Sequence, residues 1–271
     1  MRRTTDIIDE IDQSGFCILP GFINSSQLAM LEEAHRALTN HSNIQTKGIS
    51  RQQGSSKGTV VRVSKSALKH EQPEAYDFFN QELMNQVAKA FFDKHPFDLN
   101  DEVFFTDETG QGQSLLPWHF DREHSLKFYL PLTQLSDGGG ALEFDKGSQR
   151  EGHFRANFYK LKGIPTRNIP NDIPESEIRI PVQVKLNPGD LIIFDSDCFH
   201  RVCVLENGHP RKIIRGHTHS LPRNSYKVSL FSSSWWLSSF FNLAKLIGNQ
   251  AARKIASERL TKAICREDNH N

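Results

Sequence analysis

The sequence predicts a mainly β protein whose strand-rich core is flanked by helices. Between residues 99 and 231 the chain consists of short alternating or apolar runs, separated by Gly, Pro, Asp and Asn. Such runs, with turn residues between them, are typical of an all-β sandwich or barrel. The predicted strands are Glu102–Thr106, Leu115–His119, Leu126–Leu132, Ala141–Phe144, Ile178–Val184, Leu191–Phe194, His200–Leu205 and Lys212–His219.

The segment before this core, residues 1–98, has a mainly helical pattern. Asn24-Ser25-Ser26 can cap one helix, because leucines recur at helical spacing after it. A second helix is predicted from Pro73 to Phe92. Between the two helices, residues 41–70 are polar and rich in Ser, Gly, Gln and Lys, interrupted only by Thr59-Val60-Val61-Arg62-Val63. We expect a long polar loop there, which is either a lid over a site or a solvated surface loop.

Two further segments lie outside the predicted strands. Residues 149–176 contain three prolines and are expected to form an insertion over one end of the barrel. Residues 232–271 return to helical spacing, which predicts a C-terminal helix. That helix packs on the outer sheet, forms a dimer interface or makes a peripheral contact with a membrane surface. We interpret residues 1–271 as a single domain with a core over residues 99–231.

Composition excludes several classes of protein. The 33 basic and 32 acidic residues nearly cancel, whereas a nucleic-acid-binding surface needs a basic excess. The four cysteines form no CxxC pair, which argues against a disulfide framework and a thiolate zinc site. No apolar run reaches the ~18 residues of a membrane span, and acids replace the apolar stretch of a signal peptide. We expect a cytoplasmic monomer or homodimer.

A metal-ligand motif, His119-Phe120-Asp121, ends one predicted strand. Because side chains alternate along a strand, His119 and Asp121 point to the same side. A third ligand, His200, begins a later strand. Two imidazoles and one carboxylate on one face hold non-haem iron(II) and leave positions open for other ligands. An HxD motif alone is frequent by chance, so the downstream histidine carries the interpretation.

Two other histidines offer a competing metal site. His217 and His219 also lie two residues apart on one predicted strand. An all-histidine site there would suit a different metal chemistry. We interpret these two side chains instead as the lining of a pocket.

The chain resembles the phytanoyl-CoA dioxygenase family over roughly residues 5–220. The features that carry the resemblance are Gly15-Phe16, Trp118-His119-Phe120-Asp121, Gly138–Phe144 with Gly147-Ser148, Pro188-Gly189-Asp190, His200 and Arg211. The chain departs from the family at Asp145–Gln149, where Pro-Gly-Ser-His is usual. The tail after Tyr226 also has no counterpart in the family.

The resemblance implies a double-stranded β-helix, which is a cupin-like jelly roll. It further implies iron(II), 2-oxoglutarate and O2 as cofactors, and hydroxylation with release of succinate and CO2. By the same resemblance His119, Asp121 and His200 match the iron ligands. Arg211 matches the residue that binds the distal carboxylate of 2-oxoglutarate. The planar guanidinium suits this role because it pairs with a carboxylate through two bonds and stays charged when buried.

Further candidates follow from strand alternation. Lys127 and Tyr129 share a face of the strand after the HxD motif, and either could donate to 2-oxoglutarate. Alternatively, Tyr129 packs in the core and Lys127 lies at the rim.

Arg215 and His217 share a face with Arg211. A second buried cation needs an anionic partner. That partner is either an acid of the chain, such as Glu143 or Asp195, or a carboxylate or phosphate of the substrate. We therefore expect a small-molecule substrate near Arg215 and His217, and an anionic one under the second alternative.

Two other functions remain open at this level. A cupin-type metalloenzyme that does not use 2-oxoglutarate would keep the three metal ligands but would not need Arg211. A non-catalytic jelly-roll binding module would be expected to lose at least one ligand, and all three are present.

Overall fold

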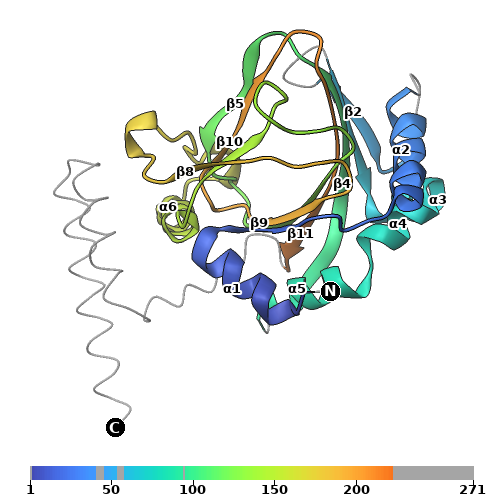
Figure 1. Ribbon diagram of the computed structural model, residues 1–271. Coiled ribbons are helices and arrows are strands. Elements are labelled where there is room, and N and C mark those ends of the chain that lie inside the picture. Colours follow the sequence, from blue (N-terminus) through green and yellow to red (C-terminus); the bar gives the residue numbers. More distant parts are fainter. Residues whose placement is uncertain (1, 41–45, 54–57, 94, 222–271) are drawn as a thin grey trace, which may run out of the picture. The chain divides into compact units, whose positions relative to one another are not determined.

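Two antiparallel sheets, one of seven strands and one of four, form the frame of the protein (Figure 1). The computed structural model describes residues 2–40, 46–53, 58–93 and 95–221, which belong to one unit. The predicted C-terminal helix at residues 232–271 lies outside them. The paired sheets confirm the mainly β fold with flanking helices and the jelly-roll core.

Helices precede the jelly roll and one more interrupts it. The helices are α1 (Thr4–Ser14), α2 (Ser25–Asn40), α3 (Lys65–Glu71), α4 (Pro73–Phe79), α5 (Glu82–Phe91), α6 (Gln149–Leu161) and the 3-10 turns η1 (Thr166–Asn168) and η2 (Glu175–Glu177). Within the described part of the chain, none of them is both long and apolar enough to cross a membrane.

The strands of the two sheets are β1 (Phe16–Leu19), β2 (Ile49–Gln53), β3 (Thr59–Ser64), β4 (Phe97–Thr109), β5 (Gln113–His119), β6 (Ser125–Pro131), β7 (Leu142–Asp145), β8 (Pro181–Val184), β9 (Leu191–Asp195), β10 (His200–Leu205) and β11 (Pro210–Ser220). The large sheet has the order β1-β9-β6-β11-β4-β3-β2, and the small sheet has the order β5-β10-β7-β8. Strands β1 to β4 belong to the large sheet, and from β4 onward the chain passes repeatedly between the two sheets. Each of the eight predicted runs overlaps one of the strands β4 to β11, although the first three residues of the run Ile178–Val184 precede β8.

The predicted polar loop over residues 41–70 is wrong for most of its length. Residues 46–71 contain β2, β3 and α3, while 41–45 and 54–57 lie outside the described residues. The error arose because β3 buries only one face, on which Val61 and Val63 are 1% and 0% exposed. Its partner β2 lies at the edge of the sheet and is mostly exposed, so the hairpin has a polar composition.

The second predicted helix, Pro73 to Phe92, is in fact two helices, α4 and α5. The break lies at Asn80, whose side-chain amide donates to the carbonyl of Tyr76. Asparagine amides compete with the helical backbone for such carbonyls. The predicted insertion at 149–176 contains α6 and the turn η1, and it joins β7 to β8.

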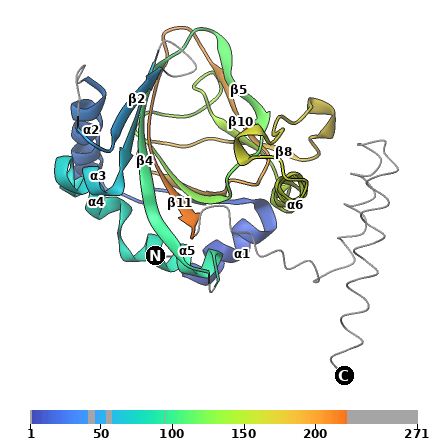
Figure 2. The same ribbon diagram turned by 180° about the vertical axis from the view of Figure 1, so that it is seen from behind.

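Two apolar layers stabilise the sheets. The outer face of the large sheet packs against the helices that precede the jelly roll, as Figures 1 and 2 show from opposite sides. Phe105 and Phe128 are fully buried in this layer. A second apolar layer contains side chains of both sheets, including Tyr129, Phe144 and Phe194. Strands β6 and β9, which lie between the two layers, are buried along their whole length.

Replacing Phe128 by alanine is expected to destabilise the fold by about 3–5 kcal/mol, because a fully buried aromatic ring leaves a cavity. Urea unfolding followed by circular dichroism measures the change. Leu116→Ala, at a side chain that is 38% exposed, serves as the control and should change the free energy of unfolding little. Equal losses in both variants would contradict the assignment of Phe128 to the core.

Candidate metal centre

The three predicted metal ligands come together at one end of the small sheet. His119 ends β5 and His200 begins β10, and the two residues are direct partners in the antiparallel register. Asp121 follows two residues after His119. Its Oδ1 lies 3.7 Å from Nε2 of His119 and 3.8 Å from Nε2 of His200. Side chains from two neighbouring strands therefore aim three ligand atoms at one point.

Hydrogen bonds fix the orientation of both imidazoles. Nδ1 of His119 is 2.8 Å from the carbonyl of Pro117, and Nδ1 of His200 is 2.7 Å from the carbonyl of Cys198. A carbonyl only accepts, so each Nδ1 carries the proton and each Nε2 presents a lone pair. This second hydrogen bond is typical of metal-binding histidines, because it sets the tautomer and the ring orientation.

The protonation states also suit a cation. Burial, together with the neighbouring His119, lowers the pKa of His200 to about 3. Burial acts to raise the pKa of Asp121, but Lys127, His200 and His119 outweigh it and lower that pKa to about 2. Metal ligands must be deprotonated to bind, and both groups are so at neutral pH. The donor set of two imidazoles and one carboxylate therefore fits iron(II).

Lys127 lies inside the barrel and not at its rim. Its side chain is 5% exposed and its ammonium forms an ion pair with Asp121. Burial would lower the pKa of Lys127, but the Asp121 carboxylate raises it. The ammonium also lies 5.6 Å above the ring of Phe194. The lysine thus adds a positive charge beside the proposed metal position.

Arg215 lies between two aromatic rings on the same inner face. Its guanidinium carbon is 5.0 Å from the ring centre of Phe104 and 5.7 Å from that of Tyr129. Nη1 donates to the Tyr129 hydroxyl at 3.4 Å, and the buried Nε has no hydrogen-bond partner within the described chain. The two acids named from the sequence as alternative partners of Arg215 lie elsewhere. Glu143 pairs with Arg201, and Asp195 lies beside His124.

Arg211 is also buried, but it has a partner within the chain. Its Nη1 lies 2.7 Å from Oε2 of Glu108, and its Nε donates to the carbonyl of Gly140 at 3.0 Å. Arg211 and Glu108 are each 4% exposed and lie opposite each other in the register of β11 and β4. Sequence reasoning missed Glu108, because its position on the inner face depends on the register between two strands distant in sequence.

His217 and His219 do not form a metal site of their own. The His217 ring lies against Phe104, with centroids 4.5 Å apart, and is parallel to the ring of Tyr129. Nδ1 of His219 instead lies 2.7 Å from Oδ1 of Asp101. Neither histidine belongs to a group of three converging ligand atoms among the residues that the structure describes.

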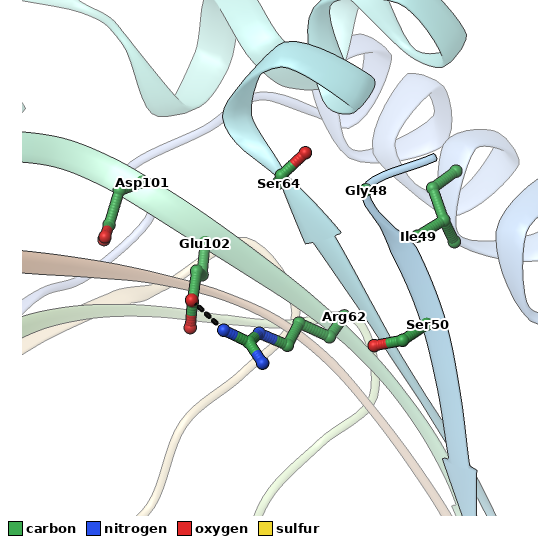
Figure 3. Close-up of a pocket in the computed structure, with 7 residues that line it drawn as sticks. All are labelled: Gly48, Ile49, Ser50, Arg62, Ser64, Asp101 and Glu102. Atoms are coloured by element: carbon green, nitrogen blue, oxygen red, sulfur yellow. Dashed lines mark hydrogen bonds and ion pairs between the residues drawn. The ribbon is translucent and has the colours of Figure 1, made fainter. Parts of the chain in front are cut away.

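A pocket of about 280 Å³ lies at the β2, β3 and β4 end of the large sheet (Figure 3). Arg62 points across it and forms an ion pair with Glu102. The pocket adjoins the end of β11, because Asp101 contacts His219 and Glu102 lies opposite His217. The lining residues are Gly48, Ile49, Ser50, Arg62, Ser64, Asp101 and Glu102. All of them except Asp101 and Glu102 lie in the segment wrongly predicted as a loop, which hid the pocket from sequence reasoning.

The jelly roll and its two imidazoles and one carboxylate define the class of cupin-fold, non-haem iron enzymes. The model of the phytanoyl-CoA dioxygenase (PhyH) family matches residues 11–211, which is most of the chain. The protein belongs to that family. A search of curated proteins finds none that matches the sequence.

Several solved structures share the fold. The epimerase SnoN, solved with Fe3+, alpha ketoglutarate and nogalamycin RO, has a TM-score of 0.55 at 14% identity, and the match covers 79% of this chain and 82% of SnoN. AviO1 from Streptomyces viridochromogenes Tue57 has a TM-score of 0.55 at 19% identity. The match covers 83% of this chain and 98% of AviO1. HygX from Streptomyces hygroscopicus, with nickel and 2-oxoglutarate bound, has a TM-score of 0.54 at 14% identity. The match covers 80% of this chain and 86% of HygX. At these identities the likeness shows the fold.

The family places the protein among non-haem iron enzymes that depend on 2-oxoglutarate. The cofactors are therefore iron(II), 2-oxoglutarate and O2. This confirms the class of enzyme and the cofactors that the sequence predicted.

We expect His119→Ala to abolish the weak visible charge-transfer band that forms when iron(II) and 2-oxoglutarate are added without oxygen, because one of three ligands is lost. Anaerobic titration of wild type and variant measures the band. His209→Ala is the matched control, since His209 is 54% exposed in the turn before β11. An unchanged band in His119→Ala would contradict the site.

Proposed function

We propose that this protein is an iron(II)/2-oxoglutarate-dependent dioxygenase that hydroxylates a polar small molecule and releases succinate and CO2. The observation that carries the proposal is the convergence of His119, Asp121 and His200, with both Nε2 lone pairs directed inward. Iron(II), 2-oxoglutarate and O2 supply the oxidising chemistry when bound. The protein residues orient these groups and exclude water.

Buried cations on the inner face support the binding of a dicarboxylate. Arg211 and Lys127 are each paired with a carboxylate of the chain, Glu108 and Asp121. If Asp121 held iron(II), the ammonium of Lys127 would be available to a new anionic partner. We assign the distal carboxylate of 2-oxoglutarate to Arg211, and a supporting contact to Lys127 and the Tyr129 hydroxyl.

Arg215 is assigned to the substrate. Its guanidinium is held by Phe104 and Tyr129, yet its buried Nε lacks a hydrogen-bond partner among the described residues. A buried donor without a partner costs free energy, and an anionic group of the substrate would satisfy it. The adjoining His217 ring is then the neighbouring substrate contact.

The pocket beside His217 and His219 supports a polar substrate. Arg62, Asp101 and Glu102 contribute charges to its lining, and Ser50 and Ser64 contribute hydroxyls. Such a surface favours a hydroxyl-rich molecule over an acyl chain, which would leave these groups without hydrogen bonds. Two relatives of similar fold were also solved with small molecules, hygromycin B in HygX and nogalamycin RO in SnoN. The cytoplasmic location and the choice between monomer and homodimer stay predictions from the sequence.

Alanine at each of the two inner arginines is expected to affect different ligands. Arg211→Ala should weaken 2-oxoglutarate binding at least about 10-fold, since a hydrogen bond to a charged group contributes about 1.5–3 kcal/mol. Arg215→Ala should leave 2-oxoglutarate binding near the wild-type value and raise the KM of the substrate. The anaerobic charge-transfer titration measures the first effect, and product formation measures the second.

The reverse pattern would overturn these two assignments. If Arg215→Ala weakens 2-oxoglutarate and Arg211→Ala does not, Arg215 is the anchor and the Arg211–Glu108 pair is structural. Should neither variant change the titration, another group of the barrel anchors 2-oxoglutarate and both assignments fail. Arg201→Ala, a partly exposed arginine paired with Glu143, is the matched control.

Substrate class can be tested through succinate release. Wild-type protein with iron(II), 2-oxoglutarate and O2 should release succinate slowly, and hydroxyl-rich anionic compounds should accelerate the release. Acyl-CoA thioesters should not, because the pocket lining is polar. Arg62→Ala is expected to reduce the acceleration while leaving the slow rate unchanged. Acceleration by acyl-CoA thioesters alone would contradict the proposed substrate class.

A further inference from the structure

A second group of metal-ligating side chains lies apart from the iron ligands. His124, His153 and Asp197 place three ligand atoms within 4.8 Å of one another. Oδ2 of Asp197 is 2.8 Å from Nδ1 of His124 and 2.9 Å from Nδ1 of His153. The proposed function gives these residues no role. The group is one of two such clusters in the part of the chain that the structure describes.

Three different segments contribute to this cluster. His124 directly precedes β6, Asp197 lies in the turn between β9 and β10, and His153 lies on α6. Helix α6 approaches the turn closely, because a Cβ at Gly152 would lie 1.9 Å from the carbonyl oxygen of Asp197. The His124 ring is packed against Phe91, with centroids 5.3 Å apart. The fold therefore holds at least two of the ligands in fixed positions.

The hydrogen bonds of Asp197 leave one of its oxygens unused. Its side chain is 0% exposed, and both imidazoles approach the same oxygen, Oδ2. The other oxygen, Oδ1, is buried and has no hydrogen-bond partner among the described residues. A buried carboxylate oxygen without a partner is costly, whereas a cation bound by both oxygens would satisfy it. This orphaned oxygen points to a ligand.

A second carboxylate increases the negative charge at this place. Oδ1 of Asp195 lies 3.6 Å from Nδ1 of His124. Burial and the charge of Asp197 raise the pKa of Asp195 to about 7. Burial acts to lower the pKa of His124, but the two aspartates raise it to about 9. A metal ion bound here would have to displace the proton that the two aspartates hold on His124.

Lys160 is a further cation near the cluster. Burial lowers the pKa of Lys160 to about 8, although Asp197 and Glu123 act in the opposite direction. The side chain of His153 is 35% exposed, which leaves a path for an ion from solvent.

We propose that His124, His153 and Asp197 form a second divalent-cation site of the zinc class, with Asp195 in reach as a fourth ligand. Two imidazole nitrogens and carboxylate oxygens are a common zinc donor set. Ligand atoms around tetrahedral zinc are about 3.3 Å apart, given Zn–N distances of about 2.0–2.1 Å. The two contacts of Asp197 would therefore widen by about 0.4 Å on binding.

The site would act structurally on the iron ligands. Ser196, between the two aspartates, accepts a hydrogen bond from the backbone N–H of Asp121 through its carbonyl, at 2.9 Å. Its hydroxyl accepts one from the N–H of Ser125 at 2.7 Å. A cation that joins His124, His153 and Asp197 would thus connect α6 to two turns. One of these turns contains Asp121, and the other leads into His200 at the start of β10.

The test counts zinc ions bound to the metal-stripped full-length protein. Wild type is expected to bind two per chain, and both His119→Ala and His153→Ala should bind one. The double variant should bind none. His153→Ala should weaken binding at the second site at least about 100-fold, since loss of an outer contact alone costs 10–100-fold. Zinc should also raise the Tm of His119→Ala but not that of the double variant.

Two outcomes would overturn the second site. One is a wild-type stoichiometry of a single zinc that His119→Ala abolishes, and the other is zinc binding that His153→Ala leaves unchanged. Failure of the iron site alone would give a different result. Wild type would then bind one zinc ion, and His119→Ala would not change that number. His209→Ala is the control and should bind two ions. His153→Gln, which keeps a polar side chain, replaces His153→Ala if the latter misfolds.

Discussion

The pairing of β5 with β10 is the constraint on which the rest of the site depends. His119 and His200 are direct partners in that pairing, so one register decides whether two imidazoles from distant parts of the sequence meet. A slip by a single residue would turn one ring to the opposite face of the sheet. The carbonyl contacts of Pro117 and Cys198 then set each ring so that Nε2 faces inward. Asp121 completes the set from the turn that follows β5.

Charges inside the barrel are arranged in pairs around this centre. Lys127 accompanies Asp121, and Arg211 accompanies Glu108, so the interior carries cations and anions in near balance. Arg215 differs, since aromatic rings hold it in place of a carboxylate. A protein that binds anions in its interior needs cations there, but it must also fold when those anions are absent. Internal partners and aromatic faces are two ways of meeting both requirements.

Much of this could be predicted from the sequence, and the limits have physical causes. Alternation and turn residues located the strands β4 to β11, and the HxD spacing with a later histidine located the three candidate metal ligands that the structure brings together. The hairpin of β2 and β3 was missed because an exposed edge strand has the composition of a loop. Glu108 and the cluster at Asp197 were missed for another reason. Both depend on which strands and helices become neighbours, and single-sequence patterns do not contain that information.

The ion pair between Lys127 and Asp121 has a consequence for the order in which ligands arrive. While the pair is intact, the carboxylate is neutralised and the ammonium is occupied. Under the proposed function, Lys127 would become available to an anion once Asp121 held a metal ion. A diacid arriving earlier would find Lys127 still paired with Asp121. These two side chains would therefore impose an order of binding, with the metal before the co-substrate. No segment of backbone would have to move.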